Sequence, residues 1–584
     1  MKPLTIYLTT LPFGSLLTHM ILFHPHKNLR RDTDPKTQEI MAKTVAFFEN
    51  KGKLKLKQDD HERVWYRDFL DFLAKEKIFS HLLTPSKYGT PECRWDNYRN
   101  CEFNEILGFY GLPYWYTWQV TILGLGPLWM SKNEEIKKKT ATLLAEGGIF
   151  GFGLSEKEHG ADLYSSEMAL TPLGSGQYLA KGRKYYIGNG NEAALLSTFG
   201  KLTDSGDYVF FAVDPKREKF ELVKNVVNSQ SYVAEYALHG YKVSENEILS
   251  KGQEAWDSSL NTVNVGKFNL GWTSIGMCTH AFYESINHAS HRRLFGHAVT
   301  EFAHIQQLFT DSYARLCAMK LFASRASDYM RTASADDRRY LLYNPMVKMK
   351  VTTQGEEVIN QLWDIIAARG FEKDMVFESV ARDIRALPKL EGTVHVNMAL
   401  IIKFMKNYFF SPSEYPEIGT QNQAKDDTFL FNQGATKGLS KIRFHDYRKV
   451  YSSVDLPNIA IFRKQIRLLK SLLMVAKPSK KQTEDFDFLL ILGELFTLVV
   501  YGQLLIESAK LNSVDDDLLD QIFDFMVRDF SKFALQLYSK TSSTKLQQLL
   551  CLQMIRKPTV NVERAERIWK TQVETLKDQY RMKE

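Results

Sequence analysis

The residue pattern changes twice along this chain of 584 residues, and the change limits the folds that it can adopt. Up to about residue 145, apolar residues recur at the spacing of amphipathic helices, as in residues 36–52 and 61–78. From 149 to about 250, glycine and turn residues become dense and short β-prone runs alternate. Helical spacing returns from about 255. The pattern predicts a mainly α-helical protein with one small central β domain.

The domain boundaries that we expect follow these changes. They give an N-terminal extension (1–34), a helical N-terminal domain (35–147), a middle β domain (148–252), a second helical domain (253–412) and a helical extension (413–584). A break rich in proline and serine, residues 411–417, precedes the extension. At roughly 100–200 residues per domain, this division suits the length of the chain.

Composition excludes several classes of protein. Apolar residues make up 44% and charged residues 25% of the chain, which excludes a disordered chain and a polytopic membrane protein. The five cysteines never form a CxxC pair, so we expect a reducing compartment and no metal site. The net charge of +8 suits anionic substrates or membrane surfaces and does not indicate nucleic-acid binding.

Three runs raise the question of a membrane. Residues 4–23 carry no charged side chain, and we expect a buried or surface-lying helix there rather than a secretory signal. Residues 461–481 form a basic amphipathic helix that either packs on the protein's own core or lies on a membrane surface. Residues 488–506 are nearly all apolar, with Glu494 as their only charge, and are long enough to span a bilayer. Glu494, Gly493, Gly502 and Gln503 favour a buried core helix instead.

Five segments carry groups suited to chemistry. A glutamate in apolar surroundings suits proton abstraction because burial raises its pKa, arginines can clamp a diphosphate, and an exposed aromatic ring can lie on a cofactor ring. Taken singly, each segment is explained at least as well by a surface turn, a core tyrosine or a solvated helix end. The segments are 148–166 with Ser155, 181–193 with Tyr185 and Tyr186, 264–277 with Lys267, 291–299 with Arg292 and Arg293, and 382–397 with Glu391.

Taken together, the order and spacing of these segments resemble the acyl-CoA dehydrogenase family of flavoproteins, over roughly residues 35–410. The resemblance implies a helical N-terminal domain, a β domain and a four-helix-bundle C-terminal domain, here followed by an extra helical tail. The matching pieces are FGLSE at 152–156, Tyr186-Ile-Gly-Asn-Gly, Asn264-x-Gly-Lys-Phe, Arg292-x-x-Phe-Gly, and Arg382-Asp followed by Glu391-Gly-Thr.

The resemblance implies α,β-dehydrogenation of an acyl-CoA thioester in fatty-acid β-oxidation. Glu391 would remove the α-proton, and the β-hydrogen would leave as hydride to N5 of FAD. Arg292 would reach the FAD of a neighbouring subunit. The cofactor residues that it implies are Phe152, Leu154, Ser155, Tyr186, Gly188, Arg292, Phe295, Thr393 and His395. The substrate residues are Ala161, Asn264 and Lys267.

Several residues depart from the family's pattern. Tyr186 replaces a tryptophan, and Gly188 replaces a threonine. Ala367 and Ala368 stand where two glycines let the backbone approach the FAD diphosphate, so two Cβ atoms add bulk there. Asp364 stands in the place of a glutamine and adds a like charge, which Arg369 offsets.

The resemblance also implies partners. They are an electron-transfer flavoprotein as electron acceptor and a second copy of the chain in a dimer or tetramer. Larger members of the family carry a helical tail for dimer contacts or for membrane docking, and both roles stay open for the extension here. The location would be cytoplasmic or peripheral to a membrane, or the mitochondrial matrix in a eukaryote. Two other functions stay open: an acyl-CoA oxidase that passes electrons to dioxygen, and a non-catalytic descendant that acts as a membrane-associated interaction protein.

Overall fold

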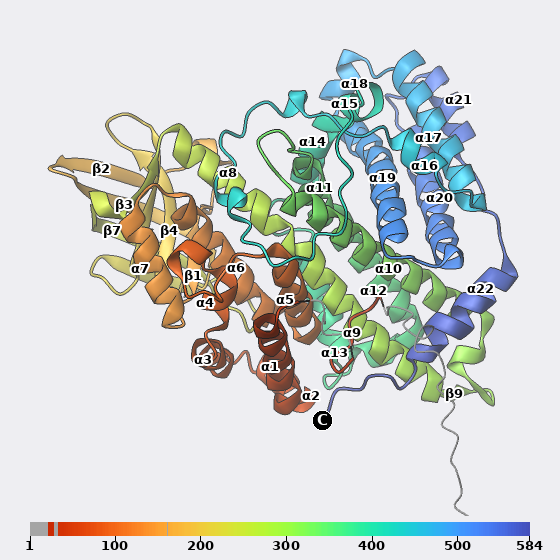
Figure 1. Ribbon diagram of the computed structural model, residues 1–584, viewed down its shortest axis with the longest axis horizontal. Coiled ribbons are helices and arrows are strands. Elements are labelled where there is room, and N and C mark those ends of the chain that lie inside the picture. The colour runs from red at the N-terminus through yellow and green to blue at the C-terminus, as the bar shows by residue number, and fades with distance from the viewer. Residues whose placement is uncertain (1–20, 28–32, 161) are drawn as a thin grey trace, which may run out of the picture.

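The computed structural model describes residues 21–27, 33–160 and 162–584. Figure 1 shows a β-sheet at one end, helices in the middle and the C-terminal extension at the other end. The expected fold class, mainly α-helical with a small central β domain, is confirmed. The helix expected within residues 4–23 falls almost wholly outside the described residues, which include only 21–23 of that run.

Seven helices precede the sheet in the described part of the chain. The run predicted as one helix over 61–78 is divided, because α2 ends at His61 and Arg63 adopts a left-handed φ of 55° before α3 begins. Pro113 lies in the first turn of α6, where a helix needs no amide hydrogen. The helices are α1 (Pro35–Lys51), α2 (Lys53–His61), α3 (Arg67–Lys75), α4 (Ile78–Leu83), α5 (Asn97–Tyr110), α6 (Leu112–Met130) and α7 (Glu134–Ala145).

The β domain is one sheet of mixed direction with its own core. Its strands run in the order β6-β7-β3-β2-β4-β5-β8, and β1 pairs with β4 in parallel. The β domain's own hydrophobic cluster contains Leu196, Phe211 and Tyr236. The strands are β1 (Phe150–Gly153), β2 (Ala169–Gly174), β3 (Gln177–Gly188), β4 (Leu195–Leu202), β5 (Tyr208–Val213), β6 (Phe220–Asn225), β7 (Val233–Ser244) and β8 (Ile248–Lys251).

The second group of helices surrounds α9. Between α11 and α12, residues Val347–Val351 form a π-helical turn. A short hairpin, β9 (Arg293–Leu294) with β10 (His297–Ala298), follows the end of α9. The helices are α8 (Gln253–Lys267), α9 (Asn269–His291), α10 (Ala303–Arg331), α11 (Tyr340–Met346), α12 (Thr352–Ile366), α13 (Val376–Asp383), α14 (Val394–Ile401) and α15 (Met405–Phe410).

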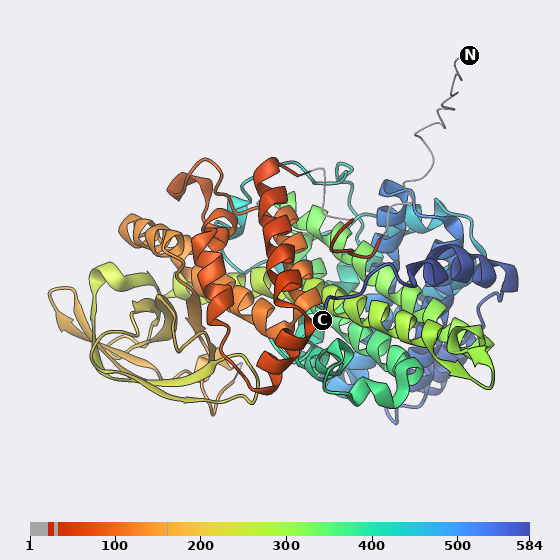
Figure 2. The same cartoon turned by 90° about the horizontal axis from the view of Figure 1, so that it is seen from below.

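The extension lies beside the other helices (Figures 1 and 2), and its buried apolar residues belong to the same hydrophobic core. Helix α19 is long and apolar enough to cross a membrane by length and composition, yet 78% of its most apolar window is buried inside the molecule, against α10, α14 and α20. Helix α17 buries its apolar face on α20 and α21, and its basic residues face outward. The helices are α16 (Tyr447–Ser452), α17 (Pro457–Val475), α18 (Lys480–Glu484), α19 (Phe486–Leu511), α20 (Asp516–Tyr538), α21 (Lys545–Met554) and α22 (Val562–Ile568).

Buried ion pairs join the extension to α10. The Arg315 guanidinium donates to both oxygens of Asp529 on α20, at 2.9 and 3.1 Å. The Arg325 guanidinium bonds Glu507 on α19 at 2.9 Å. Paired guanidinium and carboxylate groups of this kind keep their geometry because an unpaired buried charge costs several kcal/mol. The extension is therefore fixed on the helices that surround α9.

Candidate active site

Glu391 lies on a loop between the short α13 segment and α14, in a strained backbone conformation. Its φ is 52°, and Gly392 follows with a φ of 82°. A left-handed φ costs a non-glycine residue free energy and persists where surrounding contacts hold it, often at functional sites. Thr393 then caps α14, because its hydroxyl accepts from the amide of Val396 at 3.4 Å.

Burial and two neighbouring lysines have opposite effects on the pKa of the Glu391 carboxyl. Burial raises its pKa to about 7, while the positive charges of Lys267 and Lys348 and a contact with the Gln119 amide each act to lower it. Both lysines are buried, and burial lowers their own pKa values, to about 8 for Lys267 and about 7 for Lys348. The site therefore holds a carboxyl group that gains and loses its proton near neutral pH.

Helix α6 closes this site from the side of the β domain. Tyr116 lies close enough to both Tyr186 and Glu391 for their charges to act on its phenol, and burial raises its pKa. Tyr116 and Val120 also explain why residue 188 is a glycine. A Cβ atom there would lie 2.6 Å from Val120 and 2.8 Å from Tyr116, so the threonine of the family pattern does not fit.

The segment around Ser155 is pinned to β3. The Ser155 hydroxyl donates to the carbonyl of Tyr185 at 2.7 Å, and the Tyr185 amide donates back to the carbonyl of Ser155 at 3.0 Å. The buried Lys184 ammonium bonds the carbonyl of Leu154 at 3.0 Å and Glu156 at 2.7 Å. Phe152 is buried beneath this segment. The loop is thus rigid, with its position set by β3.

Tyr186 presents an aromatic ring at the open end of β3. The ring is 44% exposed and its φ is 67°, a left-handed value that turns the side chain out of the strand. A half-exposed aromatic ring beside a rigid loop is a surface on which a flat heterocycle can stack. These groups fit the isoalloxazine ring that the resemblance implies here.

Two of the three predicted substrate residues lie on α8 and are buried. Neither polar atom of the Asn264 side-chain amide has a hydrogen-bond partner among the described residues. The Lys267 ammonium donates to Asn397 Oδ1 at 3.1 Å, beside the Glu391 loop. Ala161 lies outside the described residues. An orphaned buried amide is a place where a polar ligand would be bound.

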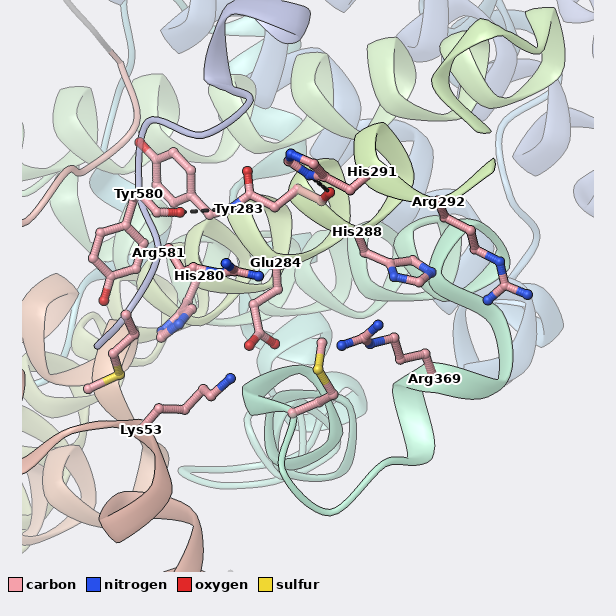
Figure 3. Close-up of a pocket in the computed structure, with 13 residues that line it drawn as sticks. Lys53, His280, Tyr283, Glu284, His288, His291, Arg292, Arg369, Tyr580 and Arg581 are labelled. Atoms are coloured by element: carbon pink, nitrogen blue, oxygen red, sulfur yellow. Dashed lines mark hydrogen bonds between the residues drawn. The ribbon is translucent and has the colours of Figure 1, made fainter. Parts of the chain in front are cut away.

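Arg292 and Arg369 meet in a cavity of about 400 Å³ at the far end of α9. Figure 3 shows Arg292, His288 and Arg369 at one end of this cavity and Lys53 and Tyr580 at the other. Burial and the charges of both arginines lower the pKa of His288 to about 4, so the imidazole is neutral at physiological pH. Two guanidinium groups beside a neutral histidine suit a diphosphate.

In the segment with the two alanines, Ala367 adopts a backbone conformation that is typical of glycine. Ala367 has φ 54° and ψ −139°, a conformation that glycine adopts without strain and alanine does not. Ala367, Ala368 and Asp364 are all exposed. The backbone path of the family's double glycine is therefore present, with two Cβ atoms added on its open side.

The groups predicted to hold one cofactor lie at opposite ends of α9. This helix has 23 residues and is about 35 Å long at 1.5 Å per residue. Lys267, which lies beside the Glu391 loop, ends α8 two residues before α9 begins, and Arg292 follows the end of α9. In Figure 1 the β domain and the β9 hairpin lie at opposite ends of the molecule. Phe295, at the tip of that hairpin, is 93% exposed.

Thr393 and His395, also predicted near the cofactor, are exposed, and the His395 ring lies against Phe486 of α19. Sequence reasoning missed other residues that contact the Glu391 loop or lie close to it. They come from elements distant in the sequence, and no local motif signals them. They are Tyr116, Gln119, Lys348 and Asn397.

The chain is similar to proteins of known function. Residues 254–406 match the family model "Acyl-CoA dehydrogenase, C-terminal domain". The rat (Rattus norvegicus) mitochondrial very long-chain specific acyl-CoA dehydrogenase is 24% identical over 401 residues, which cover 65% of this chain and 59% of the rat protein. The caffeyl-CoA reductase-Etf complex subunit CarC of Acetobacterium woodii is 25% identical over 57% of this chain and 88% of its own length.

Solved structures share the fold. A Bacillus anthracis acyl-CoA dehydrogenase complexed with FAD superposes with a TM-score of 0.73 at 18% identity, over 95% of this chain and 97% of its own. Butyryl-CoA dehydrogenase from Megasphaera elsdenii superposes with a TM-score of 0.56 at 20% identity, over 63% of this chain and 97% of its own. The match to the first structure covers nearly the whole chain and so includes the extension, whereas the match to the second leaves more than a third of the chain uncovered.

We predict that Ala367→Gly stabilises the protein. Glycine removes the strain of a positive φ, a gain of about 1 kcal/mol after its own entropic cost, or roughly 1 °C in the unfolding midpoint of a chain this size. Ala368 lacks the positive φ, so Ala368→Gly is the matched control and should lower the midpoint. Scanning calorimetry measures both, and equal shifts would contradict the strain.

Proposed function

We propose that this chain, which belongs to the acyl-CoA dehydrogenase family, is an FAD-dependent dehydrogenase that removes two hydrogens from the α and β carbons of an acyl-CoA thioester. The observation that carries the proposal is the Glu391 carboxyl, buried among cationic groups with its pKa raised to about 7. We further propose that the enzyme serves fatty-acid β-oxidation.

Glu391 acts as the general base. Its ionised carboxylate accepts the α-proton of the substrate, and a pKa near 7 gives it both an ionised population and the basicity for the transfer. Lys267 and Lys348 offer positive charge beside the negative charge that develops on the thioester when the proton leaves. The orphaned amide of Asn264 is available to bind the polar part of the substrate.

FAD, when bound, supplies the acceptor for the β-hydrogen as hydride. Tyr186 would stack on the flavin ring, and Phe152, Leu154, Ser155 and Gly188 would form the wall beside it. Lys184 holds the carbonyl of Leu154, so this wall does not need to rearrange when the cofactor binds. Thr393 and His395 would lie nearer the rest of the cofactor.

We propose an electron-transfer flavoprotein as the electron acceptor. The name of the Acetobacterium woodii relative includes an Etf complex, which supports this class of partner. An oxidase would instead reduce dioxygen after the same first half-reaction. Rapid reoxidation of the reduced flavin in air would favour the oxidase, and slow reoxidation would favour the dehydrogenase.

We predict that a long-chain acyl-CoA, added without oxygen, bleaches the flavin band of the purified protein. Glu391→Gln should slow bleaching by about 10²–10⁴-fold because it removes the base. Below pH 7 the wild-type rate should fall tenfold per pH unit, since protonation removes the ionised carboxylate.

Glu414→Gln is the control for this experiment, because Glu414 is 80% exposed in the extension and should leave the rate unchanged. A flavin band that does not bleach would exclude long-chain acyl-CoA as the substrate. Failure to bind added FAD would favour the non-catalytic alternative.

We also propose that two copies of the chain share each FAD. The residues beside the flavin lie near the start of α9, and Arg292 and Arg369 lie near its other end, one helix length of about 35 Å away. The arginines would therefore clamp the diphosphate of the cofactor that a partner subunit holds. The exposed ring of Phe295 at the hairpin tip supports a subunit contact there.

Loss of the arginines should therefore weaken both FAD binding and the dimer. We predict that Arg292→Ala and Arg369→Ala each raise the FAD dissociation constant by at least about tenfold, the typical effect of a lost charge-assisted hydrogen bond. Arg448→Ala, an exposed site in the extension, is the control. Isothermal titration of the FAD-free protein and light scattering measure the two effects, and an FAD-loaded monomer would contradict the shared site.

We propose that the tip of the extension contacts a membrane surface. Gln547 on α21 bonds the carbonyl of Ala476 and the side chain of Gln482, so α17, α18 and α21 meet at one point. The membrane-contact patch consists of four exposed apolar residues with a basic rim. The apolar residues are Met474, Val475, Leu546 and Leu549, and the rim is Lys477, Lys480, Lys481 and Lys545.

Binding to lipid vesicles tests whether this patch contacts a membrane. We predict that the protein cosediments with vesicles containing anionic lipid, less at high salt because the rim charges are screened. Leu546→Glu combined with Leu549→Glu should abolish cosedimentation, since it removes apolar area and adds negative charge. Leu222→Glu, at an exposed position on β6, is the control and should still bind. Binding that survives the double substitution would exclude this patch.

A further inference from the structure

A buried lysine outside every motif named above lies on the π-helical turn between α11 and α12. Lys348 is fully buried. Single π-helical turns are frequent at functional sites. On this turn Lys348 points to the Glu391 loop, while Lys350 lies near Glu494 and Asp529 of the extension.

Lys348 bonds the backbone on both sides of Glu391. Its ammonium group donates to the carbonyl of Pro388 at 2.6 Å and to the carbonyl of Gly392. The two acceptors stand three residues before and one residue after the base. One cation therefore closes the loop that carries the carboxyl group.

A second donor acts on the same carbonyl. The Asn397 amide donates to the carbonyls of Gly392 and Thr393, each at 3.0 Å, and accepts from Lys267 at 3.1 Å. Two consecutive left-handed residues, Glu391 and Gly392, need such contacts to stay in one conformation. The two bonds from Lys348 join Pro388 and Gly392, at the two ends of the loop.

We propose that Lys348 is a positioning residue for the base: its ammonium group clamps the 388–392 loop, and so fixes the direction of the Glu391 carboxyl toward the substrate. The inference rests on the proposed function for its kinetic consequence but not for the clamp itself. A base displaced by about 1 Å loses roughly 10²-fold in rate, so the clamp matters to catalysis.

The titratable groups that face Glu391 come from three elements. Lys267 lies on α8, Lys348 on the π-helical turn and the Tyr116 phenol on α6, with the Gln119 amide in contact. Lys348 itself also experiences the charges of Lys389 and Glu356. Because Lys348 lowers the pKa of Glu391, loss of its charge should raise that pKa.

The test compares Lys348→Met with Lys350→Met, a second buried lysine on the same turn that makes no bond to the loop. Lys348→Arg is included in case the methionine variant folds poorly, because arginine keeps the charge and changes the reach. Circular dichroism and FAD content first establish that each variant folds and loads cofactor.

Hydrogen–deuterium exchange of peptides covering 388–397 is the readout that does not depend on activity. Lys348→Met should speed exchange of this loop at least tenfold, and Lys350→Met should not. In anaerobic bleaching by acyl-CoA, Lys348→Met should slow the rate at least about 10²-fold and move the acid limb of the pH profile above 7. Lys348→Arg should slow the rate and leave the limb near 7.

Unchanged loop exchange in Lys348→Met would overturn the proposal. A slower rate with an unmoved acid limb in Lys348→Met would also overturn it, because a structural defect alone lowers the rate without changing the titration of Glu391. If the wild type does not bleach with acyl-CoA, the proposed function fails, while the exchange experiment still decides whether Lys348 clamps the loop.

Discussion

The close packing around α9 is the constraint on which the rest of the structure depends. At Gly276 a Cβ atom would lie 2.1 Å from the backbone carbonyl of Glu105 on α5, and at Gly271 it would lie 2.5 Å from Val347 on the π-helical turn. Both distances are shorter than any side chain allows, so these helices approach α9 only because the residues are glycines. Helix α5 of the N-terminal domain and the π-helical turn that carries Lys348 therefore both pack closely against α9.

That arrangement decides the chemistry of Glu391. Burial alone penalises the ionised carboxylate, and the ammonium groups of Lys267 and Lys348 stabilise it. The three groups also perturb one another, since the Glu391 charge acts to raise the pKa of both lysines and the Lys267 charge acts to lower that of Lys348. A base poised near neutral pH is the balance of these effects. It depends on packing that brings α8, the π-helical turn and the loop together.

The sequence predicted part of this site and missed the rest for a physical reason. Glu391, Arg292, Ser155 and Tyr186 stand in local motifs, so their neighbours along the chain identify them. The residues that contact the base do not. In the sequence, Lys348 is a lysine in a helical segment with no motif around it. Its role depends on a bond to the carbonyl of Gly392, 44 residues away. The helix expected over 61–78 failed similarly, because a left-handed residue at Arg63 divides it.

The sequence by itself determined the order of helices and strands and the type of chemistry available, because periodicity and residue type are local properties. The tertiary structure alone decided which cations meet the base and that Ala367 keeps a glycine backbone. It also decided that the two halves of a predicted cofactor site lie at opposite ends of α9. Burial, close approach and strain are set by contacts between residues far apart in the chain, which no local pattern encodes.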